Sequence, residues 1–175
     1  MRNAEQAAPV LTRADAEDFL YREARLLDEG HWREWQKLFM PDALYWLPSS
    51  AAPEVDPDNY ISIIYDDMDL LNERLGRLES GACHAQIPSS RTLHVIGNVM
   101  VSAAENHAVV FSNQVIHEYR SNTQSRFYPL QAFPAHCEHH LRWHACEWKM
   151  AFKKVQLLNC DGEIFDLSLD RKSVV

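Results

Sequence analysis

Residues 136–145, HCEHHLRWHA, alternate between two kinds of side chain with a period of two. The odd positions carry Cys, His, Leu, Trp and Ala, and the even positions carry His, Glu, His, Arg and His. Successive side chains of a β-strand point to opposite faces of the sheet, so the run predicts a strand with one mostly apolar face and one polar face. Four of the nine histidines lie here, which raises the question of a metal site.

Three other runs have the same strand-like character, because valine, isoleucine and aromatic residues dominate them. They are RTLHVIGNVMV (91–101), HAVVFSNQVIHEYR (107–120) and WKMAFKKVQLL (148–158). Polar stretches separate these runs, as expected of the turns and loops of an antiparallel sheet. The second half of the chain is therefore predicted to form four long strands.

The first half is predicted to be mainly helical. Thr12 is a suitable cap for a first helix that ends at residues 28–30, and apolar residues recur along it at helical spacing. Further helices are expected at 31–39 and 67–80, and short strands at 43–48 and 61–65. Helices first and long strands after indicate an α+β domain. We expect three helices packed on the concave face of one curved, mostly antiparallel sheet.

The 175 residues suit a single domain, which we place at residues 12–175 after a flexible arm at residues 1–11. The formal net charge is −8. Nucleic acids and anionic membranes both attract basic patches, so neither is expected as a partner. The sequence has neither a long apolar membrane span nor an apolar signal core near its start. These features lead us to expect a cytoplasmic protein.

The histidine-rich run does not satisfy the spacing rules for a metal site. Cys137-Glu138-His139 has the form CxH, and a Rieske iron–sulfur cluster takes two Cys and two His ligands. The matching CxxH loop is missing, since EWK follows Cys146 and DGE follows Cys160. In a strand His140 and His144 would lie about 13 Å apart, too far to share an ion. We therefore expect no metal in this chain, and interpret the run as a polar sheet face or a subunit contact.

Three blocks of the sequence resemble a known family in the same order. FLYREARLLDEGHWREWQKLFMPDALYWLP (19–48) resembles the opening of the small (β) subunits of aromatic-ring-hydroxylating dioxygenases. PSSRTLHVIGNVMV (88–101) is similar to their mid-chain PPSRTRHxxxNV segment, and WKMAFKKVQLLN (148–159) to their closing strand. The opening and closing blocks are most similar to subunits of benzoate- and anthranilate-type oxygenases. One departure is Ala135-His136, where the family often has Gly-Arg.

The resemblance implies an NTF2-like (cystatin-like) cone and a structural role. Such β subunits assemble with a large α subunit, usually as α3β3. The α chain carries a [2Fe-2S] Rieske cluster and a mononuclear Fe(II), and the holoenzyme adds both atoms of O2 to an aromatic ring to give a cis-dihydrodiol. Electrons come from NAD(P)H through a reductase, sometimes with a ferredoxin. In this interpretation the chain itself has no catalytic, cofactor-binding or metal-binding residues.

An alternative is a stand-alone enzyme of the same fold. Asp28, Tyr45, His94 and His117 resemble the polar residues of scytalone dehydratase, although Leu27 stands where that enzyme has a tyrosine. An Asp–His pair would act there as a general base while Tyr45 polarises a carbonyl. A third possibility, a binding module with a ligand in the cone, has no specific motif in its favour.

Several other residues receive a structural interpretation. The charged residues of the first helix, Arg22, Glu23 and Arg25, are expected at the solvent or at an interface. Phe165 and Leu167 are expected to be interface residues, because the C-terminal end of the family often packs against neighbouring subunits.

Overall fold

The computed structural model describes residues 9–52, 56–57, 59–80, 90–120 and 129–162. Most of the predicted arm, up to residue 8, lies outside these residues, as do Phe165, Leu167 and the rest of the segment 163–175. Leu11, at the end of the predicted arm, is buried in the hydrophobic core. Within the described residues the elements follow in the order α1, α2, β1, β2, α3 and β3 to β6.

The first helix, α1 (Arg13–Asp28), begins where the sequence predicts it, because Thr12 and Asp15 cap its N-terminus reciprocally. The Thr12 hydroxyl accepts a hydrogen bond from the Asp15 backbone N–H, and the Asp15 carboxylate accepts one from the Thr12 backbone N–H. This capping box satisfies two backbone donors that the helix leaves unpaired. Glu29 and Gly30 follow the helix, and Gly30 has a φ of 73°.

The other two helices are shorter. α3 (Met68–Glu79) agrees with the predicted helix, and the Asp67 carboxylate caps it by accepting two backbone N–H groups. α2 (Trp32–Gln36) ends before the predicted boundary at residue 39. The reason is that Phe39 already pairs with Met150 in the sheet, so backbone pairing replaces the last helical turn.

Six strands form one sheet in the order β2-β1-β6-β5-β4-β3. Their bounds are β1 (Phe39–Pro48), β2 (Ser62–Asp66), β3 (Arg91–Ala104), β4 (His107–Tyr119), β5 (Leu130–His144) and β6 (Glu147–Leu157). β1 runs parallel to β6, and every other neighbouring pair is antiparallel. The sheet is thus mostly antiparallel, as predicted.

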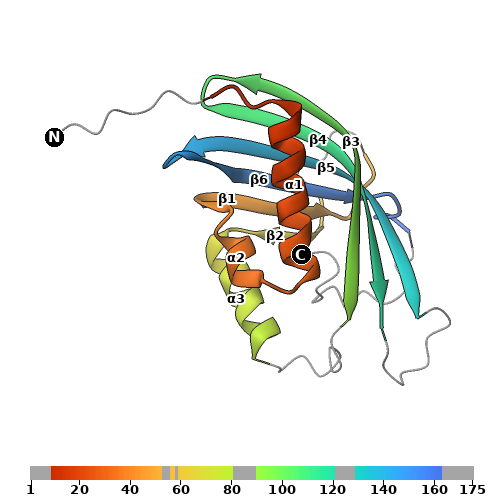
Figure 1. Cartoon of the computed structure of the whole chain (residues 1–175). Coiled ribbons are helices and arrows are strands. Elements are labelled where there is room, and N and C mark those ends of the chain that lie inside the picture. The colour runs from red at the N-terminus through yellow and green to blue at the C-terminus, as the bar shows by residue number, and fades with distance from the viewer. Residues whose placement is uncertain (1–8, 53–55, 58, 81–89, 121–128, 163–175) are drawn as a thin grey trace.

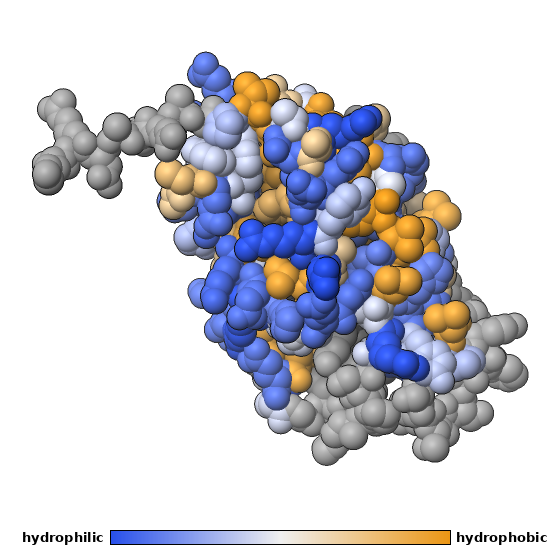
Figure 2. Space-filling model, viewed as in Figure 1, coloured by the Kyte–Doolittle hydropathy of each residue, from blue (hydrophilic) through white to orange (hydrophobic). Residues whose placement is uncertain are grey.

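The strands β3 to β5 bend strongly, and the three helices lie inside the bend (Figure 1). We call the sheet face toward the helices the inner face and the convex face the outer face. Hydrophilic side chains dominate the surface over α2 and α3, whereas apolar side chains gather over the β3 side of the molecule (Figure 2). The hydrophobic core fills the space between the inner face and the helices.

The alternation in β5 decides which side chains enter this core. Cys137, His139 and Leu141 are buried on the inner face, whereas His136 is exposed on the outer face. The predicted strand with two unlike faces is therefore confirmed. One imidazole of the run, that of His139, enters the core, and its surroundings there determine what it does.

Candidate functional site

A carboxylate–histidine pair joins the end of α1 to β3. The Asp28 Oδ1 lies 2.7 Å from the His94 Nδ1, and the Asp28 Oδ2 accepts the backbone N–H of His94 at 3.0 Å. Burial by itself raises the pKa of Asp28, but the hydrogen bonds from His94 outweigh it, so the pKa is lowered overall. The sequence-based hypothesis is right that Asp28 and His94 meet.

This pair borders a depression of about 400 Å³ between α1 and β3, which Tyr21, Arg25 and Val95 also line. The His94 side chain is only 2% exposed, against 18% for Asp28. Because Nδ1 faces a carboxylate, Nε2 is the ring nitrogen left for another partner. Such a pair acts as a general base only where a substrate can reach Nε2.

Tyr45 lies deeper in the molecule, in the core beneath the inner face. Its ring packs edge-on against Trp35 with centroids 6.2 Å apart, and the Lys153 ammonium lies 5.5 Å from its ring centroid. Burial is the main reason why the pKa of Tyr45 is raised, so its phenol stays protonated.

His117 points to the opposite face of the sheet from His94. Residues directly opposite each other in an antiparallel pair share a face, and His117 is opposite Leu93, whereas His94 is opposite Ile116. Leu93 is 58% exposed and Ile116 only 3%. The structure therefore brings together Asp28 and His94, buries Tyr45 on the same side of the sheet, and places His117 on the outer face.

A second carboxylate–histidine pair lies in the core and was not foreseen. Glu23 of α1 is 2% exposed, so the expectation that it lies at the solvent or an interface is wrong. Its Oε2 lies 3.1 Å from the His139 Nε2, and its Oε1 accepts hydrogen bonds from the Lys153 Nζ at 2.8 Å and the Trp35 indole N–H at 3.1 Å. Four elements, α1, α2, β5 and β6, therefore meet at one carboxylate.

The charges of this cluster compensate one another. Burial would raise the pKa of Glu23, but attraction to Lys153 and His139 and their hydrogen bonds lower it well below its ordinary value. The Lys153 ammonium also lies 5.4 Å from the Trp35 ring centroid. A buried charge is tolerated when it is paired and hydrogen-bonded, so the cluster is an internal cross-link between the helices and the sheet.

The sequence does contain signals for this cluster. Glu23 follows Leu20 by three positions and precedes Leu27 by four, so it lies on the apolar side of α1. His139 occupies the apolar register of its strand, and Lys153 lies two residues before the buried Val155. An ionisable residue in each of three apolar patterns is a signal that each side chain is buried, although the patterns do not say which partner it meets.

The same contacts test whether the CxH triplet suits an iron–sulfur cluster. Cys137 and His139 share the inner face, and the His139 Nε2 faces Glu23, which leaves its Nδ1 as the one ring nitrogen that could bind a metal. Burial raises the pKa of Cys137 to about 12, so its thiol stays protonated, and the thiolate is the form that binds metal. A Rieske cluster needs two Cys and two His ligands, and no second Cys–His pair lies beside Cys137 and His139 among the described residues, so these residues do not fit such a cluster. Among the described residues, no group of three or more His, Cys, Asp or Glu side chains is placed to hold a metal ion.

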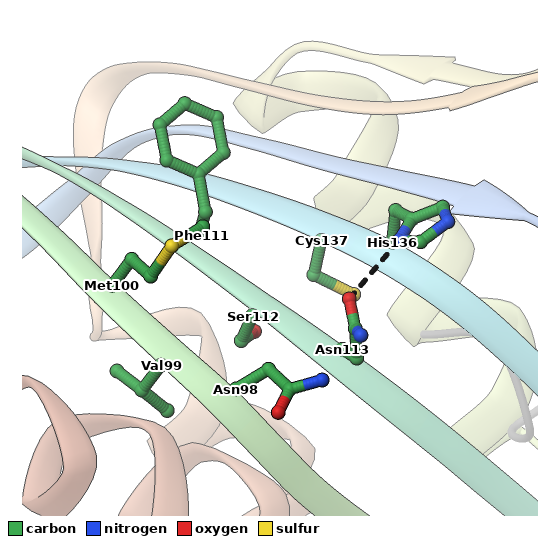
Figure 3. A pocket seen from close by; sticks show the side chains of 8 residues that line it. All are labelled: Asn98, Val99, Met100, Phe111, Ser112, Asn113, His136 and Cys137. Carbon is green, nitrogen blue, oxygen red and sulfur yellow. Dashed lines mark hydrogen bonds between the residues drawn. The ribbon is translucent and has the colours of Figure 1, made fainter.

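The outer face has a different character. A shallow groove of about 650 Å³ lies beside the β-bulge at Asn98, with Met100, Phe111, Asn113 and His136 around it (Figure 3). The His136 Nδ1 lies 3.0 Å from the Asn113 Oδ1, so the imidazole is held against the sheet. Met100 and Phe111 are 63% and 41% exposed, respectively. Ser112 and Cys137 also line the groove but are nearly buried, and no carboxylate is among its described lining residues, so its exposed apolar and amide groups suit contact rather than chemistry.

The model of one protein family, the ring-hydroxylating β subunits, matches residues 22–161. The chain belongs to this family. The match covers α1 from residue 22 onward, the whole sheet and both carboxylate–histidine pairs. The resemblance found in the three sequence blocks is thereby confirmed.

Two relatives from Pseudomonas putida show how near the family members are. The small oxygenase component of the p-cumate 2,3-dioxygenase system is 39% identical over 103 residues, 58% of this chain and 57% of that one. The β subunit of toluate 1,2-dioxygenase is 34% identical over 116 residues, 63% of this chain and 72% of that one. The chain thus matches between about half and three quarters of the length of these relatives.

Solved structures agree with the fold. The β subunit of benzoate 1,2-dioxygenase from Burkholderia mallei superposes with a TM-score of 0.70 at 28% identity, over 87% of this chain and 94% of that one. An NTF2-like protein with a cystatin-like fold from Novosphingobium aromaticivorans gives 0.57 at 14% identity, over 84% and 82% of the two chains, which shows the fold alone. The predicted NTF2-like α+β fold is confirmed. No described helix is long and apolar enough to cross a membrane.

Proposed function

We propose that the chain is a structural, non-catalytic subunit in the terminal oxygenase of an aromatic-ring dioxygenase. The observation that carries this proposal is the set of contacts of Glu23. Its buried carboxylate contacts Lys153, His139 and Trp35 and is therefore not available for chemistry on a substrate. This acid–base cluster serves to hold four elements together. Family membership supports the same role.

The partner in this proposal is the large α subunit, assembled with the chain as α3β3 in the cytoplasm. The α chain would hold the [2Fe-2S] Rieske cluster and the mononuclear Fe(II), and the described residues of this chain offer no group of three or more ligand side chains that could hold a metal ion. The holoenzyme would use O2 and electrons from NAD(P)H, passed on by a reductase or a ferredoxin, to form a cis-dihydrodiol. The contribution of this chain is to hold the large subunits in place.

The substrate class that we propose is an aromatic carboxylate. The two relatives and the solved β subunit described above are named after aromatic carboxylates, namely p-cumate, toluate and benzoate. Because a β subunit of this kind is not expected to touch the ring, this part of the proposal concerns the whole assembly.

Co-expression with a large oxygenase subunit from the same organism tests the proposal. The expected result is a complex of equal numbers of the two chains, with a mass corresponding to three copies of each. Iron should be present in the complex and in the large subunit, and absent from this chain when it is purified alone. A chain that does not bind the large subunit would contradict the proposal.

The Asp28–His94 pair favours a second candidate, a stand-alone dehydratase, because it is the one predicted catalytic contact that the structure forms. That function requires turnover of a hydroxylated cyclic ketone by the isolated chain without iron, and its loss in Asp28→Asn. We expect no turnover, because His117 lies on the other face of the sheet and the His94 side chain is nearly buried. Turnover that disappears in Asp28→Asn would establish the dehydratase.

A further inference from the structure

Three buried side chains on the inner face of the sheet each have a polar atom without a hydrogen-bond partner among the described residues. The atoms are the Ser112 Oγ and the Gln114 Nε2 on β4, and the His139 Nδ1 on β5. The three residues are 3%, 4% and 0% exposed, respectively. Buried polar groups in native proteins are almost always hydrogen-bonded, either to the protein or to ordered water. Each of these atoms therefore needs a partner.

The strand register places the three side chains next to one another. Ser112 and Gln114 are two positions apart on β4, so their side chains share a face at a spacing of about 7 Å. Ser112 is opposite Cys137, and His139 follows two positions further along β5 on the same face. Ser112 and His139 are thus diagonal neighbours. The three unpaired atoms form a row with Ser112 in the middle.

His94 extends this row toward the margin of the core. Gln114 is opposite Ile96 on β3, and His94 lies two positions before Ile96 on the same face, which makes it a diagonal neighbour of Gln114. The His94 Nδ1 contacts Asp28, so its Nε2 is left for another partner. The His94 side chain is only 2% exposed, so that partner has to lie inside the fold.

The side chains of His94, Gln114, Ser112 and His139, which we call the inner polar row, lie between the two carboxylate–histidine pairs. Diagonal neighbours in a sheet are about 7–8 Å apart at the backbone. The short Ser112 side chain does not cross such a gap, and no hydrogen bond joins it to either neighbour. A buried water molecule typically makes about three hydrogen bonds to polar groups that have no other partner. Water therefore suits the gaps of the row.

The chemistry around the row also suits water. An amide nitrogen donates, a hydroxyl both donates and accepts, and an imidazole nitrogen does either according to its protonation. Water matches all of these groups, whereas an apolar molecule would leave them unpaired. The residues opposite Ser112 and Gln114 on β5 are Cys137 and Ala135, so no large apolar side chain faces the two polar groups from that strand.

We propose that a chain of bound water molecules runs along the inner polar row. It hydrogen-bonds the Ser112 Oγ, the Gln114 Nε2, the His139 Nδ1 and the His94 Nε2. The water chain links the carboxylate–histidine pair that is sealed in the core to the pair at its margin, so a change at one end is transmitted to the other. It forms whether or not the protein is assembled with a large subunit.

A crystal structure of the whole chain at a resolution that shows ordered water tests the proposal directly. We expect water oxygens at about 2.7–3.2 Å from the Ser112 Oγ, the Gln114 Nε2 and the His139 Nδ1. In solution, NMR cross-relaxation should show long-lived water beside the Gln114 carboxamide and the His139 ring. Side chains that pair directly with one another, or polar atoms that lie against apolar groups without water, would overturn the inference.

Two variants and a control test whether the waters form one chain. Ser112→Ala removes the middle member with little change in volume, and it should abolish the water signals at both Gln114 and His139. Gln114→Leu should shift the imidazole nitrogen resonances of His139 as well as those of His94, although Gln114 and His139 are not neighbours. Ile116→Val, on the same face of β4 but outside the row, should leave the His139 resonances unchanged.

Far-UV circular dichroism establishes that each variant is folded. Ser112→Ala decides the question by itself if Gln114→Leu does not fold, because a serine-to-alanine change leaves the packing nearly intact. An effect of Ser112→Ala on only one of its two neighbours would mean that the waters are separate, and it would overturn the link between the two pairs. A shift of the His139 resonances in Ile116→Val as large as that in Gln114→Leu would have the same consequence, because packing alone would then transmit the change.

Discussion

The helix α1 holds two histidines of the sheet with two carboxylates, five residues apart, and the two pairs differ in almost everything except their chemistry. Glu23 and His139 are 2% and 0% exposed, and Lys153 completes their charge balance. Asp28 and His94 lie at the end of the helix beside a depression, where the Asp28 side chain is 18% exposed. The first pair is sealed in the core and the second is at its margin.

The difference shows that an acid–base pair does not define a catalytic site by itself. At Glu23 every contact reaches another element of the fold, so the pair stabilises the arrangement of helices and sheet. At Asp28 the carboxylate binds both the side chain and the backbone N–H of His94, which fixes the start of the edge strand β3 to the helix. Both pairs stabilise the fold, and the contribution of each to the free energy of unfolding depends on how deeply it is buried.

Replacing Glu23 by Gln should have the largest effect on stability. The substitution keeps the shape but leaves the Lys153 ammonium buried without its counter-charge, a loss of about 3–5 kcal/mol in the free energy of unfolding. Urea unfolding followed by far-UV circular dichroism measures it. Glu17→Gln, on a more exposed part of the same helix, is the matched control and should change the free energy by less than about 0.5 kcal/mol. Equal effects of the two substitutions would contradict the cross-link.

The pH dependence of the free energy of unfolding should differ between the Glu23–His139 pair and the Asp28–His94 pair. The pKa of Glu23 and that of Asp28 are both lowered in the folded chain. A carboxylate with a depressed pKa stabilises the fold above its ordinary pKa, and this contribution is lost as the pH falls below that value. The ordinary values are 4.5 for Glu23 and 3.8 for Asp28, so the decline begins near pH 4.5.

Unfolding free energies of the unchanged chain, Glu23→Gln and Asp28→Asn between pH 3 and pH 7 check this expectation. The slope below about pH 4.5 should become shallower in both variants, and more so in Glu23→Gln, because the buried carboxylate has the stronger partners. A slope that Glu23→Gln leaves unchanged would show that this carboxylate does not contribute to acid unfolding.

Asp28→Asn should have an intermediate effect. The amide can keep one contact with His94 but loses the charge-assisted hydrogen bonds, which are worth about 1–3 kcal/mol in such a setting. The loss should be local as well as global, so hydrogen exchange at the His94 backbone N–H should accelerate. Glu29→Gln, one residue further on and exposed, is the control. An Asp28→Asn chain with unchanged stability would mean that the end of α1 is not fixed to β3.

The comparison also separates what the sequence predicts from what it does not. Period-two alternation predicted the faces of β5, and the capping pattern at Thr12 predicted the start of α1, because both depend on neighbouring residues. The Asp28–His94 contact was predicted by resemblance. The role of Glu23 was not predicted. It depends on Lys153, which is 130 residues away in the sequence and contacts Glu23 in the core. Likewise, the face on which His117 lies follows from the strand register.

His117→Ala should have the smallest effect of the series. The imidazole lies on the outer face opposite Leu93, and it makes no hydrogen bond or ion pair with any described side chain. A substitution at such a position usually changes the free energy of unfolding by less than about 0.5 kcal/mol. His139→Ala is the paired measurement, because it removes an imidazole from the core of the same sheet and should cost several times more. If His117→Ala lowered the free energy of unfolding as much as Asp28→Asn does, the outer-face histidine would contribute to stability, and the assignment of His117 to a surface role would be wrong.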